Sequence, residues 1–179
     1  SGQAPICFPI CGGLRDGRAM AMGGREVKLA RHGFARKQEW KLEEQSDNMV
    51  ALSLSSADHA ELLEQYPYPF RIVARYTIDS EKVVVSYEVT NEGTEDMPFF
   101  VGGHPGFKCP LDEGESYDDY ELRFEQREAD ELCTAVPSTG LIDVEHRSKN
   151  PMIGQNLPLT HELFDFAETI FDVLESRVV

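Results

Sequence analysis

Two of the five histidines lie in sequence surroundings that would suit proton transfer. His32 falls within RHGFAR at residues 31–36, and His104 falls within GGHPGF at residues 102–107. Three glycines and a proline leave little side-chain bulk around the His104 imidazole, so a ligand could approach the backbone closely. Histidine exchanges a proton near neutral pH, which makes both residues candidates for acid–base catalysis. Composition alone favours the plainer alternative, in which each is a hydrogen-bonded turn histidine at a strand end.

Apolar residues recur at every second position through much of the chain, a pattern typical of β-strands with one buried face. Residues 70–78 and 83–90 alternate in this way around a polar turn, and they predict an antiparallel hairpin. Residues 38–44 and 48–55 predict a second strand pair, and residues 120–125 predict one more strand. These strands are the elements that would position the two histidines.

Helix signals are few. Ser56 could cap a short helix through Gln65, and Thr160 could cap another through about Ala167. With so little helix, the chain is predicted to be all-β, most simply a sandwich, and to form a single domain over residues 1–179.

The overall charge narrows the range of partners. The chain has 32 acidic and 17 basic residues, which give a formal net charge of −15. Such a surface repels phosphate backbones, so nucleic acid is not an expected partner, whereas a neutral or cationic small ligand is easier to accommodate. No apolar run approaches the ~20 residues of a membrane-spanning helix, so no membrane partner is expected either.

The four cysteines, at positions 7, 11, 109 and 133, contain no C-x-x-C pair. Together with an N-terminus that does not read as a signal peptide, they predict reduced and mostly buried thiols in a cytoplasmic protein. Their spacing does not support a metal site shared with histidine, so no metal is expected.

Both ends of the chain fall within predicted strands. An apolar, strand-like stretch is already under way at residues 5–10, and residues 176–179 begin another. Because cut strands would leave unpaired sheet edges, we expect the chain to be a segment of a longer polypeptide, truncated at both ends.

Several short motifs in a fixed order carry a family resemblance. Besides the two histidine motifs, the sequence has FPI at residues 8–10, LRDG at 14–17, YPYPF at 66–70 and YEVTN at 87–91. In this order, across most of residues 3–111, they resemble the aldose 1-epimerase (mutarotase) family, and most closely its bacterial LacX-like branch. The resemblance implies a galactose-mutarotase-like β-supersandwich, of which this chain would be an incomplete segment.

The family interconverts the α and β anomers of a free aldose, and the resemblance implies the same isomerase activity here. A base takes the proton of the anomeric hydroxyl while an acid protonates the ring oxygen, so that the ring opens, rotates and closes with the other face presented. His104 matches the family's acid, and His32 matches the histidine that binds and orients the sugar. Neither role requires a metal or an organic cofactor. The family's base, a glutamate, is expected beyond residue 179.

The resemblance also suggests residues that bind the aldohexose. The branch commonly has an arginine where this sequence has Gly13, and Arg15 could compensate for it. Arg36 completes the first histidine motif, and it could either hydrogen-bond the sugar or pair with a carboxylate. Phe34 and Phe107, beside the two histidines, could offer an aromatic face to the sugar ring.

A family aspartate that binds sugar hydroxyls corresponds loosely to residues 164–171. Asp165, Ala167 or Glu168 could fall on that position, and Glu168 is our candidate.

Two alternatives stand beside a mutarotase for free hexoses. A hexose-6-phosphate 1-epimerase would need a basic clamp, which Arg15, Arg18, Arg31 and Arg36 could form, although the net charge of −15 argues against it. A non-catalytic carbohydrate-binding relative would keep the cleft and lose the chemistry. The sequence indicates neither the sugar nor the oligomeric state.

Overall fold

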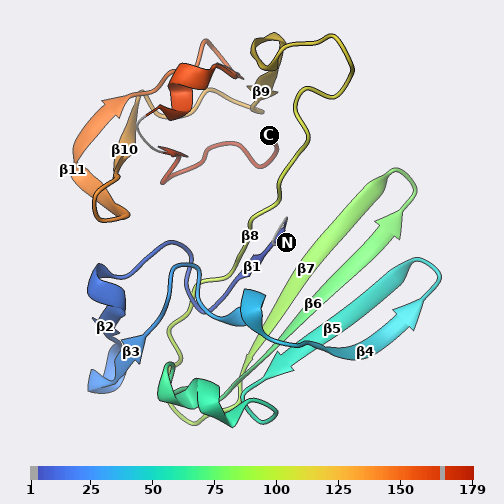
Figure 1. The fold of residues 1–179 in the computed structure, drawn as a ribbon, viewed down its shortest axis with the longest axis vertical. Coiled ribbons are helices and arrows are strands. Elements are labelled where there is room, and N and C mark those ends of the chain that lie inside the picture. The colour runs from blue at the N-terminus through green and yellow to red at the C-terminus, as the bar shows by residue number, and fades with distance from the viewer. Residues whose placement is uncertain (1–3, 166–167) are drawn as a thin grey trace. The chain divides into compact units, whose positions relative to one another are not determined.

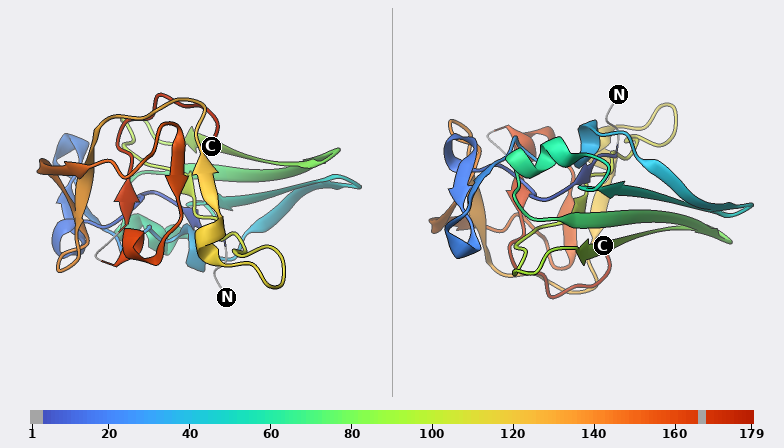
Figure 2. Two further views of the ribbon diagram at one scale, coloured as in Figure 1. Left: turned by 90° about the horizontal axis from the view of Figure 1, so that it is seen from above. Right: turned by 90° about the horizontal axis from the view of Figure 1, so that it is seen from below.

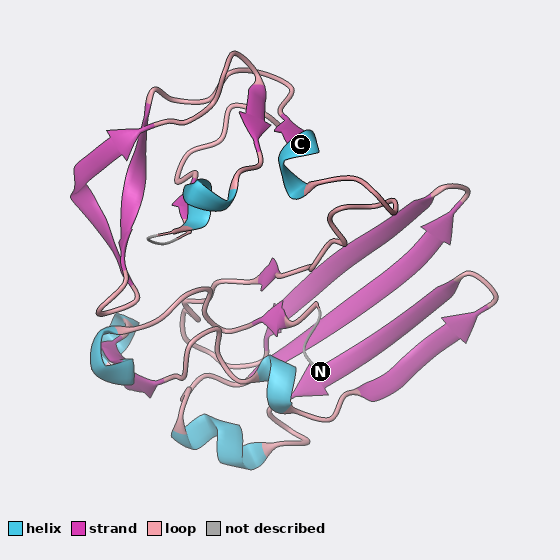
Figure 3. Ribbon diagram, turned by 45° about the horizontal axis from the view of Figure 1, so that its top comes forward, coloured by secondary structure: helices cyan, strands magenta, loops and turns pink. Residues whose placement is uncertain are grey.

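The computed structural model describes residues 4–165 and 168–179, and the chain forms two compact units, Ser1–Pro105 and Gly106–Val179 (Figure 1). Nearly all regular structure in both units is β-strand, with a few short 3₁₀ helices between the strands (Figure 3). The all-β class predicted from the period-two pattern is therefore confirmed. Within the described residues, no helix is long and apolar enough to cross a membrane.

An antiparallel four-stranded sheet dominates the first unit, with strands β4 (Lys41–Ser46), β5 (Met49–Ser55), β6 (Phe70–Asp79) and β7 (Lys82–Asn91). The strands lie in chain order, β4-β5-β6-β7, so the sheet consists of two consecutive hairpins. Both predicted strand pairs are confirmed. The first strand begins at Lys41 and not at residue 38, because residues 38–40, which follow the 3₁₀ helix η3 (Ala35–Lys37), are not paired with β5.

The two faces of this sheet differ in polarity. On one face Ile72 of β6 lies opposite Val89 of β7 and Leu54 of β5, and the three side chains belong to or pack on the core. The other face carries ion pairs across the sheet, such as Arg71–Glu43 at 3.0 Å. The hairpins extend away from β2 (Arg18–Met20) and β3 (Glu26–Lys28) of the same unit (Figure 2).

Aromatic side chains form the centre of the first unit's core. The Phe8 ring is fully buried and lies 5.1 Å from the Phe70 ring and 6.3 Å from the Tyr66 ring, centroid to centroid. Such tilted and edge-on contacts add about 0.5–1.5 kcal/mol each beyond the burial of area. Two small sheets border this core: β1 (Ile6–Cys7) pairs with β8 (Gly102–Gly103), and β2 pairs with β3.

The predicted helices are shorter than expected. In place of a helix over residues 56–65 the structure has the 3₁₀ helix η4 (Ala60–Glu64). Ser56 does not cap it, because its hydroxyl accepts a hydrogen bond from the Phe70 N–H at 3.0 Å and so ties the turn to β6. In the second unit, η6 (His161–Phe164) follows Thr160 for four residues, and Ala167 lies outside the described residues. The remaining 3₁₀ helices are η1 (Arg15–Gly17), η2 (Met22–Gly24) and η5 (Tyr117–Asp119).

The described residues of the second unit form two small sheets and a separate buried cluster. Its strands are β9 (Glu121–Arg123), β10 (Glu131–Val136), β11 (Leu141–Lys149), β12 (Asn156–Pro158) and β13 (Thr169–Ile170). Strand β10 lies between β11 and β13, and β9 pairs with β12. Phe124, Met152 and Leu157 form the buried cluster, and the Phe124 and Phe171 rings lie 5.0 Å apart.

A buried carboxylate holds the end of the chain in this second unit. Glu128 is 3% exposed, and its carboxylate accepts hydrogen bonds from the N–H groups of Glu175 at 2.7 Å and Ser176 at 2.9 Å. The Ser176 side chain, followed by these N–H groups, lowers the pKa of Glu128 below the ordinary glutamate value. A lowered folded-state pKa stabilises the fold above the unfolded pKa of about 4.3, and the stabilisation disappears as the pH falls through the folded value.

We expect Glu128→Gln to loosen residues 175–177 at neutral pH, because an amide offers one acceptor oxygen where two N–H donors must be satisfied. Amide hydrogen exchange across these residues should become faster in the variant, and this acceleration should disappear as the pH falls from the unfolded glutamate pKa of about 4.3 through the lowered folded value. Glu121→Gln, at an exposed glutamate on β9, is the control. Unchanged exchange in Glu128→Gln would show that the carboxylate does not anchor the segment.

Candidate functional site

The first histidine motif has a backbone that few residues can adopt. His32 has φ 66° and Gly33 has φ 72°, so two consecutive residues lie in the left-handed region. A Cβ on Gly33 would lie 2.1 Å from the Phe8 carbonyl oxygen, which no real side chain tolerates. Histidine enters the left-handed region more readily than most residues, whereas the close approach at position 33 requires glycine. The His-Gly pair therefore reflects a backbone requirement as well as a side-chain one.

The His32 imidazole is held by a backbone donor. The Gly12 N–H donates to His32 Nδ1 at 3.1 Å, and the His32 N–H donates to the Gly12 carbonyl at 2.7 Å. Because Nδ1 accepts a hydrogen bond, the proton of the neutral ring is assigned to Nε2. The ring thus offers an N–H donor from Nε2, and this is the group that could bind a sugar oxygen.

The second histidine follows β8 directly. Gly102 and Gly103 pair with Cys7 and Ile6 of β1, and the His104 N–H donates to the Pro5 carbonyl at 3.1 Å. A Cβ on Gly103 would lie 3.1 Å from the Tyr87 hydroxyl, so a bulkier residue would crowd the strand.

These local arrangements bring the two imidazoles together. The ring centroids of His32 and His104 are 5.3 Å apart, and the ring planes are inclined by 71°. His32 is half-buried and His104 is exposed, so the pair is open to solvent on the His104 side. Two proton-exchanging groups at this separation can reach neighbouring oxygens of one small ligand.

Tyr87 is a site neighbour that the sequence motifs did not single out. It lies on β7, and its hydroxyl is the atom that a Cβ on Gly103 would meet first. Burial raises the pKa of Tyr87, so the phenol keeps its proton at neutral pH and can donate it in a hydrogen bond. Only its place in the motif at residues 87–91 could have indicated this position.

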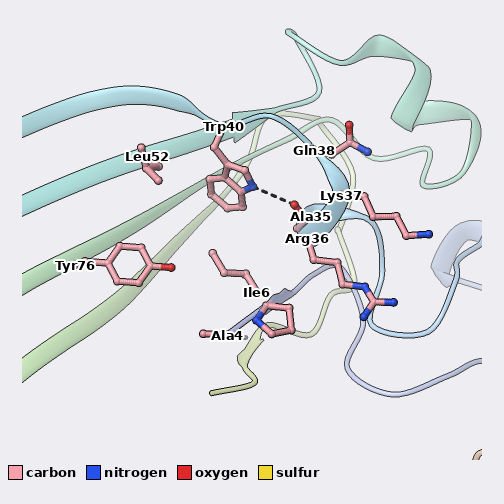
Figure 4. Close-up of a pocket in the computed structure, with 10 residues that line it drawn as sticks. Ala4, Ile6, Ala35, Arg36, Lys37, Gln38, Trp40, Leu52 and Tyr76 are labelled. Carbon is pink, nitrogen blue, oxygen red and sulfur yellow. Dashed lines mark hydrogen bonds between the residues drawn. The ribbon is translucent and has the colours of Figure 1, made fainter. Parts of the chain in front are cut away.

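The predicted Arg36 lies in η3 and borders a cleft of about 520 Å³ in the first unit. Figure 4 shows the Trp40 indole, the Tyr76 ring and Ile6 around this cleft, with Arg36 and Lys37 at its side. The Trp40 N–H donates to the Ala35 carbonyl at 3.0 Å, which fixes the indole against η3.

The other predicted binding residues of the first unit lie in different surroundings. Phe34 is 5% exposed and packs edge-on against Phe8, with ring centroids 6.1 Å apart, so its ring faces the core. Arg15 is exposed on η1. Arg18, one of the four possible phosphate ligands, lies 3.3 Å from Glu26 in an ion pair.

The remaining predicted residues belong to the second unit. Glu168 and Asp165 are exposed, and Phe107 is 86% exposed. Glu168 lines a cavity of about 650 Å³ within this unit, together with Glu162 and Lys149. Ala167, the third possibility for the hydroxyl-binding position, lies outside the described residues. In the described ranges 4–165 and 168–179, no three His, Cys, Asp or Glu side chains gather as metal ligands.

Comparison with known proteins identifies the family. The family model described as aldose 1-epimerase matches residues 2–173. The chain belongs to the aldose 1-epimerase family. It is 40% identical to the plasmid-encoded protein LacX of Lactococcus lactis subsp. lactis, over 100% of this chain and 61% of LacX. The chain therefore spans 61% of the length of this aldose 1-epimerase relative.

Solved structures support the same fold. A galactose mutarotase related enzyme from Lactobacillus acidophilus matches 93% of this chain and 53% of its own, with a TM-score of 0.81 and 28% identity. A galactose mutarotase-like protein from Lactobacillus casei matches 93% of this chain and 55% of its own, with a TM-score of 0.76 and 29% identity. The aldose 1-epimerase chain thus has the predicted galactose mutarotase-like fold, as part of a β-sandwich.

Two glycines with the same φ angle allow the cost of the close contact between Gly33 and Phe8 to be measured separately from the cost of the left-handed backbone. Gly33 and Gly23 both have φ +72°, but a Cβ on Gly23 meets nothing within 4 Å. We expect Gly23→Ala to cost about 1–2 kcal/mol for the left-handed backbone alone. Gly33→Ala should cost at least ~1–3 kcal/mol more, because the methyl group must displace the Phe8 backbone.

Urea denaturation of the two variants beside the parent chain measures this difference. If Gly33→Ala and Gly23→Ala lost the same stability, the Phe8 backbone would move aside with no loss of free energy. The contact between Gly33 and Phe8 would then not fix the His32 backbone.

Proposed function

We propose that this aldose 1-epimerase family chain provides the two-histidine half of a mutarotase site for a free hexose. The observation that carries the proposal is the imidazole pair, with centroids 5.3 Å apart and one ring fixed as an Nε2–H donor by Gly12. The family membership supports a carbohydrate epimerase, and the open side of the pair leaves space for a small neutral ligand. A net charge of −15 suits a neutral sugar better than a phosphorylated one.

The proposed mechanism assigns a separate task to each imidazole. His104, when protonated, donates a proton to the ring oxygen while a base removes the proton of the anomeric hydroxyl, and the C1–O5 bond breaks to leave the open-chain aldehyde. Rotation about the C1–C2 bond presents the other carbonyl face, and the reverse proton transfers close the ring. His32, neutral and donating from Nε2, holds the same region of the sugar in place.

The base and the further binding groups complete the proposal. We assign the base to a glutamate of the family-length polypeptide outside this chain, which spans 61% of LacX. Arg36 and Arg15 are exposed in the first unit and are proposed to bind sugar hydroxyls. Glu168, in the second unit, stays a prediction from the family resemblance. Phe34 directly precedes η3 and its ring is buried in the core. We propose that it anchors η3 to the core and does not stack on the sugar.

The His104 assignment predicts a loss of turnover. In a polypeptide of family length that contains this chain, His104→Ala should slow mutarotation of α-glucose or α-galactose by at least ~100-fold, the lower range of general acid catalysis. Polarimetry measures the rate, and His146→Ala, at an exposed histidine on β11, is the matched control. Residues 1–179 alone should not change the optical rotation of the sugar appreciably faster than buffer alone does.

Three results would each count against one part of the proposed function. A loss below tenfold in His104→Ala would exclude His104 as the acid. Full activity from residues 1–179 would place the base within this chain. Faster turnover of a hexose 6-phosphate than of the free hexose would favour the phosphate-specific epimerase.

The His32 assignment predicts that a variant that keeps the left-handed backbone but loses the imidazole binds the sugar more weakly. His32→Asn is the suitable variant, because asparagine also adopts the left-handed conformation but its side chain is too short to replace Nε2. We expect about tenfold weaker galactose binding by titration calorimetry, the value of one lost hydrogen bond at the upper end of its range. In the family-length protein, kcat should fall and KM should rise together.

The control His146→Asn should bind galactose as the parent does. Unchanged affinity, kcat and KM in His32→Asn would leave His32 as a turn histidine of purely structural importance.

A further inference from the structure

Two cysteine thiols lie side by side next to the candidate site. Cys7 on β1 is 3% exposed, whereas Cys11 is exposed. Both border Gly102: Cys7 is its partner in the β1–β8 register, and a Cβ on Gly102 would lie 3.0 Å from Cys11 Sγ. The glycine at position 102 thus leaves the space that the Cys11 sulfur occupies beside Cys7.

The buried cysteine of the second unit has different surroundings. The Cys133 sulfur accepts a hydrogen bond from Arg147 Nη1 at 3.4 Å, and Arg147 is paired with Asp172 at 2.6 Å. Cys133 therefore serves as an internal control, because it is a buried thiol whose hydrogen-bonding neighbour belongs to an ion pair and is not a second cysteine.

We propose that Cys7 and Cys11 are an oxidant-sensitive dithiol site, which closes to an intramolecular disulfide on reaction with a hydroperoxide. Cys11 is accessible and reacts first: its thiolate attacks the peroxide, an S–O bond forms, the O–O bond breaks and hydroxide leaves. The Cys7 thiolate then attacks the Cys11 sulfur, the S–S bond forms and the S–O bond breaks, releasing a second hydroxide. With hydrogen peroxide, two thiols and one peroxide give one disulfide and two waters.

The electrostatic surroundings set the conditions for this reaction. Burial raises the pKa of Cys7, against the opposing effects of the Cys11 hydrogen bond and the Arg36 charge. Burial also raises the pKa of Cys11, and the neighbouring Cys7 raises it further. The Tyr87 hydroxyl, which lies close to Gly103 of β8, keeps its proton because burial raises its pKa as well. Few thiolates are present at neutral pH, so the reaction should be slow at pH 7 and faster at about pH 9.

The dithiol site is connected to both candidate histidines through the backbone. Cys11 precedes Gly12, whose N–H and carbonyl bind the ring and the backbone of His32. Gly102, beside both thiols, is two residues before His104. A disulfide requires a sulfur–sulfur distance of about 2.05 Å, so the two sulfur atoms must approach on oxidation, and we expect the Cys11 backbone and the adjoining Gly12 to shift with them. Oxidation should therefore alter the Gly12–His32 hydrogen bond.

The test uses the folded chain, hydrogen peroxide at about pH 9, alkylation of the remaining thiols and digestion with trypsin. Both cysteines fall in the one tryptic peptide of residues 1–15. After oxidation, we expect this peptide to be lighter by two hydrogen atoms and to carry no alkyl group. If the disulfide is reduced before alkylation, both cysteines should be alkylated. The Gly12 amide resonance should shift on oxidation and recover on reduction.

Variants separate the two thiols. Cys11→Ser, at an exposed position, should leave Cys7 reduced under the same conditions, and Cys7→Ser should leave Cys11 as a sulfenic acid that dimedone traps. Cys133→Ser should leave disulfide formation unchanged. The proposal is overturned if wild-type Cys11 proceeds to sulfinic or sulfonic acid without a disulfide, if the disulfide forms between chains, or if both thiols stay reduced. None of these outcomes depends on sugar binding or turnover.

Discussion

The candidate site depends on one close backbone contact, the approach of Gly33 to Phe8. A Cβ at position 33 would lie 2.1 Å from the Phe8 carbonyl oxygen, and this oxygen accepts hydrogen bonds from the N–H groups of Phe34 at 3.1 Å and Ala35 at 3.3 Å. Directly before this contact, His32 lies in the left-handed region, and its imidazole accepts a hydrogen bond from the Gly12 N–H. The Phe8 ring on the same residue is fully buried in the aromatic core. Phe8 thus takes part both in the core packing and in the backbone contact beside His32.

The segment of residues 5–12 links both histidine motifs. The Pro5 carbonyl accepts from His104 N–H at 3.1 Å, and the Gly12 carbonyl accepts from His32 N–H at 2.7 Å. Between them, the Pro9 carbonyl accepts from the Phe100 N–H at 2.9 Å. The regular structure in the two motifs is short, the start of η3 in the first and the two residues of β8 in the second, so each motif relies on this segment for its position. The long hairpins contribute indirectly, through the core side chains that they pack against Phe8.

The sequence predicts those features that depend on residues close together along the chain, and it predicts less well those that depend on residues far apart along it. Strand alternation is local, and it identified β6 and β7 almost to the residue. Capping is also local, but Ser56 failed as a cap because a distant strand residue, Phe70, competes for its hydroxyl. The pairing of His32 with His104 came from motif order in a known family, since no local pattern shows that residues so far apart in the sequence meet. The burial of Phe34 was missed for the same reason: its neighbours Phe8 and Phe70 come from distant segments.

The Gly12 hydrogen bond also makes the two imidazoles unequal as nucleophiles. In a neutral ring the unprotonated nitrogen carries the reactive lone pair, and at His32 that nitrogen, Nδ1, is already occupied by a backbone N–H at 3.1 Å. His104 is the more exposed of the two rings. Electrophilic acylating reagents should therefore modify the His104 ring first, although the two rings are close neighbours.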